Sequence, residues 1–421
     1  MKSIATEVDD SSARMRQAAE AQLQRPGFAM APYFYRSHVT YQRELQGILY
    51  RSWLYAGHVS QLGETGDFLV YELGEDSVIV ARSAAGDTGL HAYTNICRHR
   101  GARVCEASSG QRKTFVCPYH GWVYNLDGSL RAAREMDQLP DFSPADHGLR
   151  KLRLEVIEGL VFINFDPDAA ALTAAMAPVA RPLGAYQLTD ARVAHQHTYR
   201  IDANWKLCLE NYLECYHCAT SHRHYARSHS LKAVPEEVAA LNAEMRARAD
   251  SVTGVAGITD EYRALYSEAQ GFGACVSHWR YALYEGYLTG SQDGTPVAPL
   301  MGSMQGYDGG AGDFQFGPLS FMLAYPDHCV LYRFTPRTLT ATDLEVVWLV
   351  NGSAVEGRDY DRDALTWLWH QTTLEDEHII LRNSAGVNSH FFEPGPYHPQ
   401  FEALCAQFVS WYLKTLLDAP T

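Results

Sequence analysis

Cysteine is scarce in this chain of 421 residues, which holds only nine, and the number is odd. A small scaffold stapled by disulfides is therefore excluded. Long hydrophobic runs are missing as well, because no stretch approaches the roughly 18 consecutive apolar residues that cross a membrane. The first residues also lack the apolar core of a secretory signal. We therefore expect a cytoplasmic protein without a membrane segment, in which clustered Cys and His bind metal rather than form disulfides.

Positively charged residues are outnumbered: the chain has 35 Lys and Arg but 49 Asp and Glu, which gives a formal net charge of −14. Such an excess of negative charge repels phosphate, so we expect no nucleic-acid partner. A dinucleotide-binding fingerprint is also absent, because no G-x-G-x-x-G follows a predicted strand. Apolar residues, in contrast, make up 46% of the chain and charged residues 20%, which is typical of a globular protein of about two domains.

Two kinds of pattern divide the chain. Residues 1–49 predict a helical N-terminal segment, and 50–168 contain short β-type runs separated by turn formers, which is typical of a small all-β domain. Residues 169–421 mix strands with long helices and predict a larger domain. Within it we expect a helix over 260–268 and a long irregular loop over 285–316. The expected fold class is therefore α+β.

Cysteine and histidine alternate in two short segments of the β-rich part. The four residues form two mixed pairs separated by seventeen residues: Cys97 with His99, and Cys117 with His120. Two thiolates can hold one iron of a [2Fe–2S] cluster and two imidazoles the other, which raises the reduction potential. A structural zinc site is the alternative, although zinc motifs usually keep the two Cys in one pair and the two His in the other. Gly101 and Gly121 follow the two His closely and predict tight turns at two hairpin tips around the cluster.

A second set of ligand-type residues follows Trp205. Glu214 and His217 lie three residues apart, so a helix that starts at Trp205 would place them on one face. His222 lies five residues beyond His217. Two His and one carboxylate bind Fe(II) and leave open positions for O2 and substrate. The pattern therefore predicts a mononuclear iron site that takes a further carboxylate from elsewhere in the chain.

The same segment allows a different interpretation. Cys215 and Cys218 form a Cys-x-x-Cys motif around His217, so a zinc site or a redox dithiol is the alternative. Successive helical side chains point about 100° apart, which makes it difficult for His217 and Cys218 to face one metal. His224 and His229 follow closely, and we expect them to be surface histidines.

The residues around both sets resemble those of Rieske-type ring-hydroxylating oxygenase α subunits. The similarity is carried by three segments: 95–101, 117–122 and 204–218. It implies that the first set holds a Rieske [2Fe–2S] cluster and that His217 and His222 bind the mononuclear iron. It also implies catalytic roles for Asn211 and Glu214, with Glu214 as the carboxylate that links the iron site to the cluster of a neighbouring subunit.

The remaining iron ligand is expected on a long helix predicted over 359–383. By the resemblance it is Asp376, the second member of an acidic pair that precedes a Pro/Gly loop. The pattern agrees, because Asp376 shares a helix face with apolar and neutral residues, where an acid must be paired or bound to metal. Glu375 and Glu377 are expected to point to solvent. The alternative is a solvated acidic turn without metal.

The resemblance carries further expectations for the whole molecule. It implies a catalytic domain with an antiparallel sheet flanked by helices, of the helix-grip type, and a homotrimer. The implied cofactors are the Rieske cluster and mononuclear Fe(II), with O2 as co-substrate. Because the chain has no nucleotide fingerprint, a separate NAD(P)H-dependent reductase with flavin and iron–sulfur centres is expected to supply electrons. A non-catalytic Rieske electron carrier is the alternative to this terminal oxygenase, although the second ligand set argues against it.

Several late segments indicate a branch of the family. Residues 354–361 and 394–397, together with Glu214 where many relatives carry Asp, resemble enzymes that demethylate betaines such as stachydrine and glycine betaine. Residues 383–386 depart from that pattern, and 230–316, which we expect to line the pocket, match poorly. The resemblance nevertheless favours N-demethylation or hydroxylation of a quaternary ammonium compound.

The pocket stretch leaves two substrate classes open. A quaternary ammonium favours an aromatic cage. Four residues are candidates for it, with ordinary core packing as the alternative: Trp279, Tyr281, Tyr284 and Tyr287. An aromatic acid, as the substrate of a hydroxylation or dihydroxylation, would instead need a cationic clamp such as Arg280.

Overall fold

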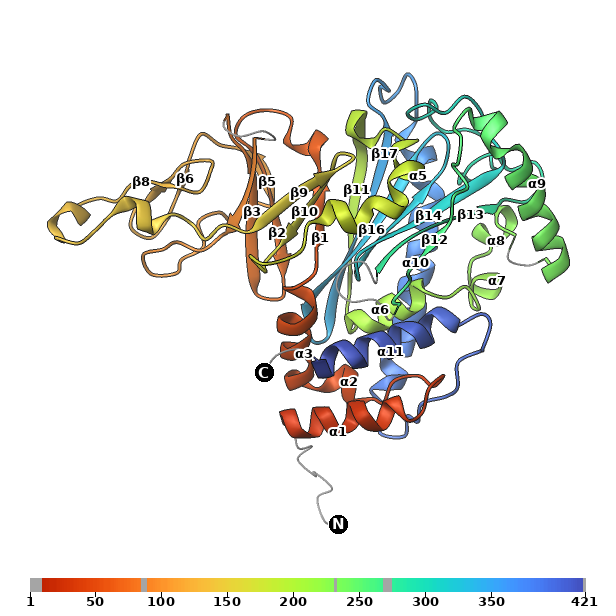
Figure 1. Ribbon diagram of the computed structural model, residues 1–421, viewed down its shortest axis with the longest axis horizontal. Coiled ribbons are helices and arrows are strands. Elements are labelled where there is room, and N and C mark those ends of the chain that lie inside the picture. The colour runs from red at the N-terminus through yellow and green to blue at the C-terminus, as the bar shows by residue number, and fades with distance from the viewer. Residues whose placement is uncertain (1–9, 85–88, 231–232, 268–274, 419–421) are drawn as a thin grey trace, which may run out of the picture.

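The computed structural model describes residues 10–84, 89–230, 233–267 and 275–418. Figure 1 shows a β-rich lobe on one side of the molecule and, beside it, a larger lobe in which helices surround a long sheet. None of the described helices is both long and apolar enough to cross a membrane.

Three antiparallel sheets build the β-rich lobe, in agreement with the expected all-β character. One contains β1 (Leu54–His58), β10 (Leu160–Asn164) and β9 (Arg153–Ile157). Another contains β4 (Leu90–Thr94), β3 (Asp76–Arg82), β2 (Asp67–Leu73) and β5 (Ser109–Gln111). The smallest contains β6 (Phe115–Val116), β7 (Val123–Tyr124) and β8 (Leu130–Ala132).

β3 lies at the centre of this lobe because both of its faces are buried. Ile79 joins a core with Phe115 and Tyr124 that also contains Cys97. Val80, on the opposite face, belongs to a larger core that is shared with the second lobe. Each fully buried Val or Ile contributes roughly 1.5–3 kcal/mol. Strand alternation therefore joins the cluster loops on one side to the large lobe on the other.

A single antiparallel sheet forms the centre of the large lobe, as expected, with the strand order β11-β17-β16-β15-β14-β13-β12. In chain order its strands are β11 (Ala191–Ile201), β12 (Tyr262–Arg263), β13 (Val276–Ala282), β14 (Gly310–Phe316), β15 (Ser320–Ala324), β16 (Cys329–Thr338) and β17 (Ala341–Asn351). The helix that carries Asp376 (Arg362–Val387) and the helix that starts at Trp205 (Trp205–Tyr212) both pack against this sheet.

Two stretches of this sheet differ from the expectation. The predicted helix over 260–268 is wrong in its described residues, because β12 pairs antiparallel with β13 there. The predicted loop over 285–316 is wrong at its end, where β14 pairs with β13 and β15. Gly310 and Gly312 lower the intrinsic strand preference of β14, but cross-strand pairing on both sides decides its conformation.

Helices cover the sheet and close the lower part of the molecule in Figure 1. Those of the N-terminal segment are α1 (Ser12–Leu23), α2 (Tyr33–Arg36) and α3 (His38–Glu44). Those of the large lobe are α4 (Leu172–Met176), α5 (Ala180–Gly184), α6 (Trp205–Tyr212), α7 (Cys218–Ser221), α8 (Tyr225–Ser228), α9 (Pro235–Thr253), α10 (Arg362–Val387) and α11 (Ala403–Asp418). α1 packs against α11, and α10 packs against α6 and β11.

One buried carboxylate ties three of these helices together. Glu44 at the end of α3 forms an ion pair with Lys206 at 2.6 Å and accepts hydrogen bonds from Trp205 Nε1 and Tyr412 OH. Both charged side chains of the pair are completely buried. Removing one member of such a pair costs about 3–5 kcal/mol, since the other charge is left without a partner. Glu44 therefore fixes α6, which leads into the predicted iron site.

Candidate functional site

The two predicted cluster loops are matching tight turns. Gly101 N–H donates to the Cys97 carbonyl at 3.0 Å, and Gly121 N–H donates to the Cys117 carbonyl at 3.0 Å. Both glycines have positive φ, +79° and +71°. A residue with a Cβ rarely adopts this conformation, so the prediction of glycine turns is confirmed.

The turns bring four side chains together at the tip of the β-rich lobe. The thiols of Cys97 and Cys117 are buried, whereas the rings of His99 and His120 are exposed, with their Nδ1 atoms 3.1 Å apart. Two nitrogens bound at about 2.1 Å to one tetrahedral metal lie about 3.4 Å apart. The imidazole pair therefore fits one iron at the surface, while the thiols lie on the inner side. Tyr124 OH lies 3.2 Å from Cys97 Sγ.

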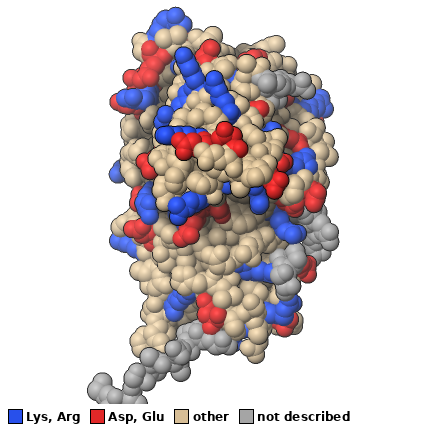
Figure 2. Space-filling model, turned by 90° about the vertical axis from the view of Figure 1, so that its left-hand side faces the viewer, with Lys and Arg blue, Asp and Glu red and all other residues tan. Residues whose placement is uncertain are grey.

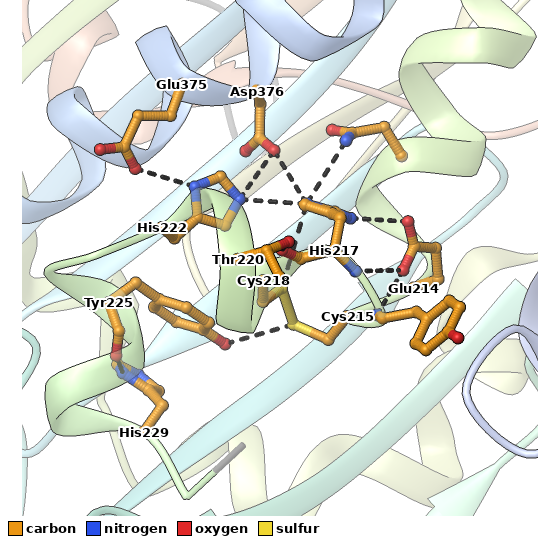
Figure 3. Close-up of a disulfide and its surroundings, with 12 residues drawn as sticks. Glu214, Cys215, His217, Cys218, Thr220, His222, Tyr225, His229, Glu375 and Asp376 are labelled. Carbon is orange, nitrogen blue, oxygen red and sulfur yellow. Dashed lines mark hydrogen bonds and ion pairs between the residues drawn. A yellow bond between two sulfur atoms is a disulfide. The ribbon is translucent and has the colours of Figure 1, made fainter. Parts of the chain in front are cut away.

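Three further side chains converge where α7 meets the middle of α10 (Figure 3). His217 Nε2 and His222 Nε2 lie 3.0 Å apart, and Asp376 Oδ1 lies 3.2 and 3.0 Å from them respectively. Metal–ligand bonds of about 2.1 Å at right angles place neighbouring ligand atoms about 3.0 Å apart. The three atoms thus have the spacing of one face of an octahedron, which fits a divalent iron with open positions on the other side. Asn211 Nδ2 lies 3.5 Å from His217 Nε2.

Each imidazole also contacts a second carboxylate through its Nδ1 atom. Glu214 Oε1 lies 2.6 Å from His217 Nδ1, and Glu375 Oε2 lies 2.9 Å from His222 Nδ1. In each ring the nitrogen that faces away from Asp376 is therefore occupied, which leaves Nε2 available for metal. The expectation that Glu375 points to solvent is wrong, because the helical turn of α10 directs it to the far side of His222 (Figure 3).

The chain between these residues is not the single helix that we expected. α6 ends at Tyr212, and α7 begins at Cys218. Glu214 Oε2 accepts hydrogen bonds from the backbone N–H groups of Tyr216 and His217, and so satisfies donors at the start of the following turn. Glu214 and His217 meet through this capping arrangement, although their spacing of three residues is also the spacing of helical neighbours.

Electrostatics hold the three converging groups together. Burial lowers the pKa of His217, but the carboxylates of Asp376 and Glu214 outweigh it and raise that pKa to about 9. The pKa of His222 is raised in the same way, against burial, by Asp376. Burial raises the pKa of Asp376, but the two imidazoles hold it below its usual range. A divalent metal takes the place of these protons when it binds.

Cys215 and Cys218 form a disulfide with a Cα–Cα distance of 4.9 Å (Figure 3). The expectation that clustered Cys would not form disulfides is wrong for this pair, and neither sulfur is free to act as a zinc ligand. Cys218 Sγ lies 4.0 Å from His217 Nε2. The expectation of a surface position is also wrong for His229, which is fully buried, with its Nε2 3.1 Å from Tyr325 OH. Burial lowers the pKa of His229 to about 3, so this ring is neutral.

A cavity of about 970 Å³ opens beside the three converging groups. Aromatic side chains supply much of its wall, among them Trp279, Tyr281, Tyr225, Tyr332 and Trp369. Of the four predicted cage residues, Trp279 and Tyr281 line the cavity, whereas Tyr284 and Tyr287 are not part of its lining.

Arg280 is not available as the clamp that an aromatic acid would need. Its guanidinium is buried, pairs with Asp308 at 2.6 Å and donates to Tyr186 OH at 2.9 Å. Arg280 belongs to the cavity lining together with Trp279 and Tyr281, but side chains alternate along β13, and its guanidinium is bound to Asp308 and Tyr186. Its charge is thus neutralised within the core.

Sequence reasoning missed two residues of this site. Glu375 belongs to the acidic pair that was recognised, and its proximity to His222 depends on the course of α7. Asp313 lines the cavity from β14, within a stretch that was expected to be a loop. A signal for Asp313 exists, since it is an acid flanked by small and aromatic residues at alternating positions.

Comparison with known proteins identifies the family. The family model described as the Rieske [2Fe-2S] domain matches residues 52–143, and the one described as the ring hydroxylating alpha subunit (catalytic domain) matches residues 188–418. The glycine betaine monooxygenase oxygenase subunit of Pseudomonas aeruginosa strain PAO1 is 33% identical over 395 residues, 93% of this chain and 90% of the relative. The chain belongs to the ring-hydroxylating oxygenase α-subunit family.

This oxygenase therefore carries a Rieske [2Fe–2S] cluster and a mononuclear iron, and its co-substrate is O2. It acts on a small-molecule substrate and receives electrons from a separate reductase. The predicted family, enzyme class and cofactors are confirmed.

Solved structures share the fold of the oxygenase. A quaternary ammonium Rieske monooxygenase superposes with a TM-score of 0.71 at 20% identity, covering 95% of this chain and 98% of that chain. Naphthalene 1,2-dioxygenase from Rhodococcus sp. superposes with a TM-score of 0.69 at 19% identity, covering 97% and 100%. Because the two scores are nearly equal, the fold alone does not distinguish amine from aromatic substrates.

Proposed function

We propose that this oxygenase removes a methyl group from a quaternary ammonium compound of the betaine type. The observation that carries the proposal is the composition of the cavity beside the three converging groups. Its walls include Trp and Tyr faces, which attract a cation without hydrogen bonds. Arg246 and Arg263 also line the cavity, and both are paired with Glu261. The candidate clamp for an aromatic acid, Arg280, is neutralised by Asp308. The similarity to a glycine betaine monooxygenase supports the same substrate class.

The proposed reaction balances with one O2, two electrons and two protons. One methyl C–H bond becomes C–OH, and the second oxygen atom leaves as water. The hydroxymethyl group then loses its bond to the quaternary nitrogen, which gives formaldehyde, a proton and a tertiary amine. Bound iron supplies the activation of O2 that this oxidation needs.

The protein side chains have defined roles in this proposal. His217 and His222, through Nε2, and Asp376 would hold the iron, while Glu214 and Glu375 orient the two imidazoles. The aromatic cavity would hold the ammonium group so that one methyl faces the open side of the iron, and it would exclude water. The four Cys and His side chains at the lobe tip would hold the cluster.

A homotrimer is part of the same proposal. Figure 1 places the cluster tip, beside β6 and β8, far from α7 in the same chain, so electrons need a route from another subunit. Tyr119 and Val116 at that tip are 55% and 51% exposed, and both are large hydrophobic residues that would favour docking. Tyr216 and Phe401 are 56% and 49% exposed next to Glu214, and their rings stack at 5.6 Å. These patches suit a contact between the tip of one subunit and the Glu214 region of the next.

Charge at the tip would set the orientation of that contact. Figure 2 views this end of the molecule and shows Lys and Arg side chains beside Asp and Glu side chains. Surfaces with both signs of charge select complementary partners and fix their register. Because the proposed electron source is an NAD(P)H-dependent reductase with flavin and iron–sulfur centres, we place the assembly in the cytoplasm.

Glu214 is the proposed link between the two metal sites. Its carboxylate is held by His217 and the adjacent backbone, and an imidazole N–H of a neighbouring cluster could share the same oxygen atoms. With Fe(II) added until both metal sites are filled, Glu214→Gln is expected to keep the trimer but to lose most turnover. Glu377→Gln, which makes the same charge change on α10, is the control. Normal steady-state activity in Glu214→Gln would remove Glu214 from the electron route.

The decisive experiment supplies a competent reductase, NADH and a panel of betaines and aromatic acids, and measures formaldehyde together with O2 uptake. Equal amounts of formaldehyde and consumed O2 are expected with a betaine. A cis-diol or phenol without formaldehyde would contradict the demethylase proposal and leave the oxygenase class intact.

A further inference from the structure

We propose that Asp313 is the counter-charge that selects a cationic substrate in this oxygenase. The inference rests on the proposed function and names the residue that would set its specificity. Asp313 lies in the middle of β14 and lines the cavity beside the converging metal ligands. Its cross-strand neighbours are Trp279 on β13 and Leu323 on β15, which also line the cavity. A carboxylate thus stands in a row that is otherwise apolar.

The Asp313 carboxylate has no partner within the described part of the protein. Its Oδ1 atom is buried without a hydrogen-bond donor. None of the ion pairs among the described residues includes Asp313. Burying a carboxylate without a partner is costly. The cost is visible in the pKa of Asp313, which burial raises to about 8, although the charge of Arg263 acts in the opposite direction. An unpaired Asp313 in the cavity can therefore be paired by the positive charge of a bound substrate.

Two further arginines that line the cavity, Arg246 and Arg263, already have an acidic partner. Arg263 pairs with Glu261 at 3.0 Å, and its guanidinium lies over the Trp279 ring at 5.2 Å. Arg246 pairs with the same Glu261 oxygen at 2.7 Å. Neither guanidinium forms a hydrogen bond or ion pair with Asp313, so no residue in the described ranges neutralises this carboxylate.

The groups around Asp313 suit a nitrogen that carries no hydrogen. A quaternary ammonium cannot donate a hydrogen bond, so it is held by ring faces and by a charge at van der Waals distance. Trp279 is the direct neighbour of Asp313, and Tyr281 follows on the same face of β13. Tyr225 lines the same cavity as Asp313, and burial together with the charge of Asp313 raises its pKa. Acid and rings together form a site for a trialkylammonium head.

The test compares substrates that differ only in charge. Glycine betaine and choline are paired with 3,3-dimethylbutanoate and 3,3-dimethylbutan-1-ol, in which a carbon atom replaces the quaternary nitrogen. Dissociation constants are measured by calorimetry on the iron-loaded oxygenase under anaerobic conditions without reductant. The variants are Asp313→Asn and, as a matched control on the same sheet, Asp343→Asn, whose carboxylate pairs with Arg337 outside the cavity.

Wild type and Asp343→Asn are expected to bind at least one cationic member more tightly than its uncharged partner. Asp313→Asn is expected to raise the dissociation constant of the cationic member by about tenfold or more, since a buried charge pair is lost. The dissociation constant of the uncharged member should change by less than about threefold. Unchanged Rieske absorption and an unchanged or higher melting temperature in Asp313→Asn would show that its fold is intact.

Two results would overturn the proposal. One is a wild-type protein without preference for the cationic member of either pair. The other is an Asp313→Asn variant that keeps the preference for the cationic member, or that binds both members more weakly by the same factor. Failure of the proposed function is a separate result, because a charge preference that depends on Asp313 can be present even if no formaldehyde is formed.

Discussion

Replacing Glu375 by Gln removes one negative charge behind a proposed iron ligand while keeping the size of the side chain. Glu375 lies 2.9 Å from His222 Nδ1, and its side chain is 32% exposed. Carboxylates in this position typically change metal affinity about 10- to 100-fold, which corresponds to about 1.4–2.7 kcal/mol. Because solvent screens a group that is a third exposed, we expect the lower end, with binding about tenfold weaker.

The assay is an anaerobic titration of the mononuclear site with Fe(II) against a chelator of known affinity. Rieske absorption serves as an internal measure of intact protein. Glu377→Gln is the matched control, since Glu377 lies on the same helix and makes no ion pair with either His among the described residues. Affinity in Glu377→Gln should equal that of wild type. Equal affinities in both variants would refute the argument that Glu375 strengthens His222 as a ligand.

Three further predictions concern the metal sites and a buried acid. Cys117→Ala should abolish the visible Rieske absorption, because one of the two thiolates is lost. Asp376→Ala should keep that absorption and lower the iron content from three to two per chain, and a full three irons would show that another acid is the ligand. Glu210 is buried and accepts hydrogen bonds from Tyr35, and burial raises its pKa from 4.5 to about 7. Between these values the folded state keeps a proton that the unfolded state loses, so stability should fall by up to about 3 kcal/mol as pH rises from 5 to 8. Urea unfolding of Glu210→Gln should not show this fall, and a parallel decline in both proteins would contradict the assignment.

The proposed metal-ligand residues could be named from the sequence because the patterns that carry them are local. Cys and His in fixed spacing, with a glycine at each turn, specify the cluster loops without knowledge of the rest of the fold. Asp376 is distant in sequence, and its prediction depended on resemblance as much as on its helix face. The role of Glu375 could not be assigned, because it arises from a contact between segments that are far apart in the sequence, and for Asp313 the sequence offered only the weak signal of strand alternation. β14 was missed for the same reason, since its pairing partners outweigh the weak strand preference of Gly312.

The ion pair at Glu44 has a consequence for how electrons reach the catalytic lobe. The pair joins α3, before the β-rich lobe, to α6, after it, so the β-rich lobe is inserted between two segments that are packed together. Gly74 N–H also donates to the Pro336 carbonyl at 2.8 Å, which attaches this lobe to β16. A cluster domain on a single flexible hinge can move between electron donor and acceptor. The β-rich lobe, anchored in this way, keeps its position relative to the large lobe. In the proposed trimer, the distance between the redox centres of neighbouring subunits would then be fixed by assembly, and the rate of electron delivery would depend on that assembly rather than on domain motion.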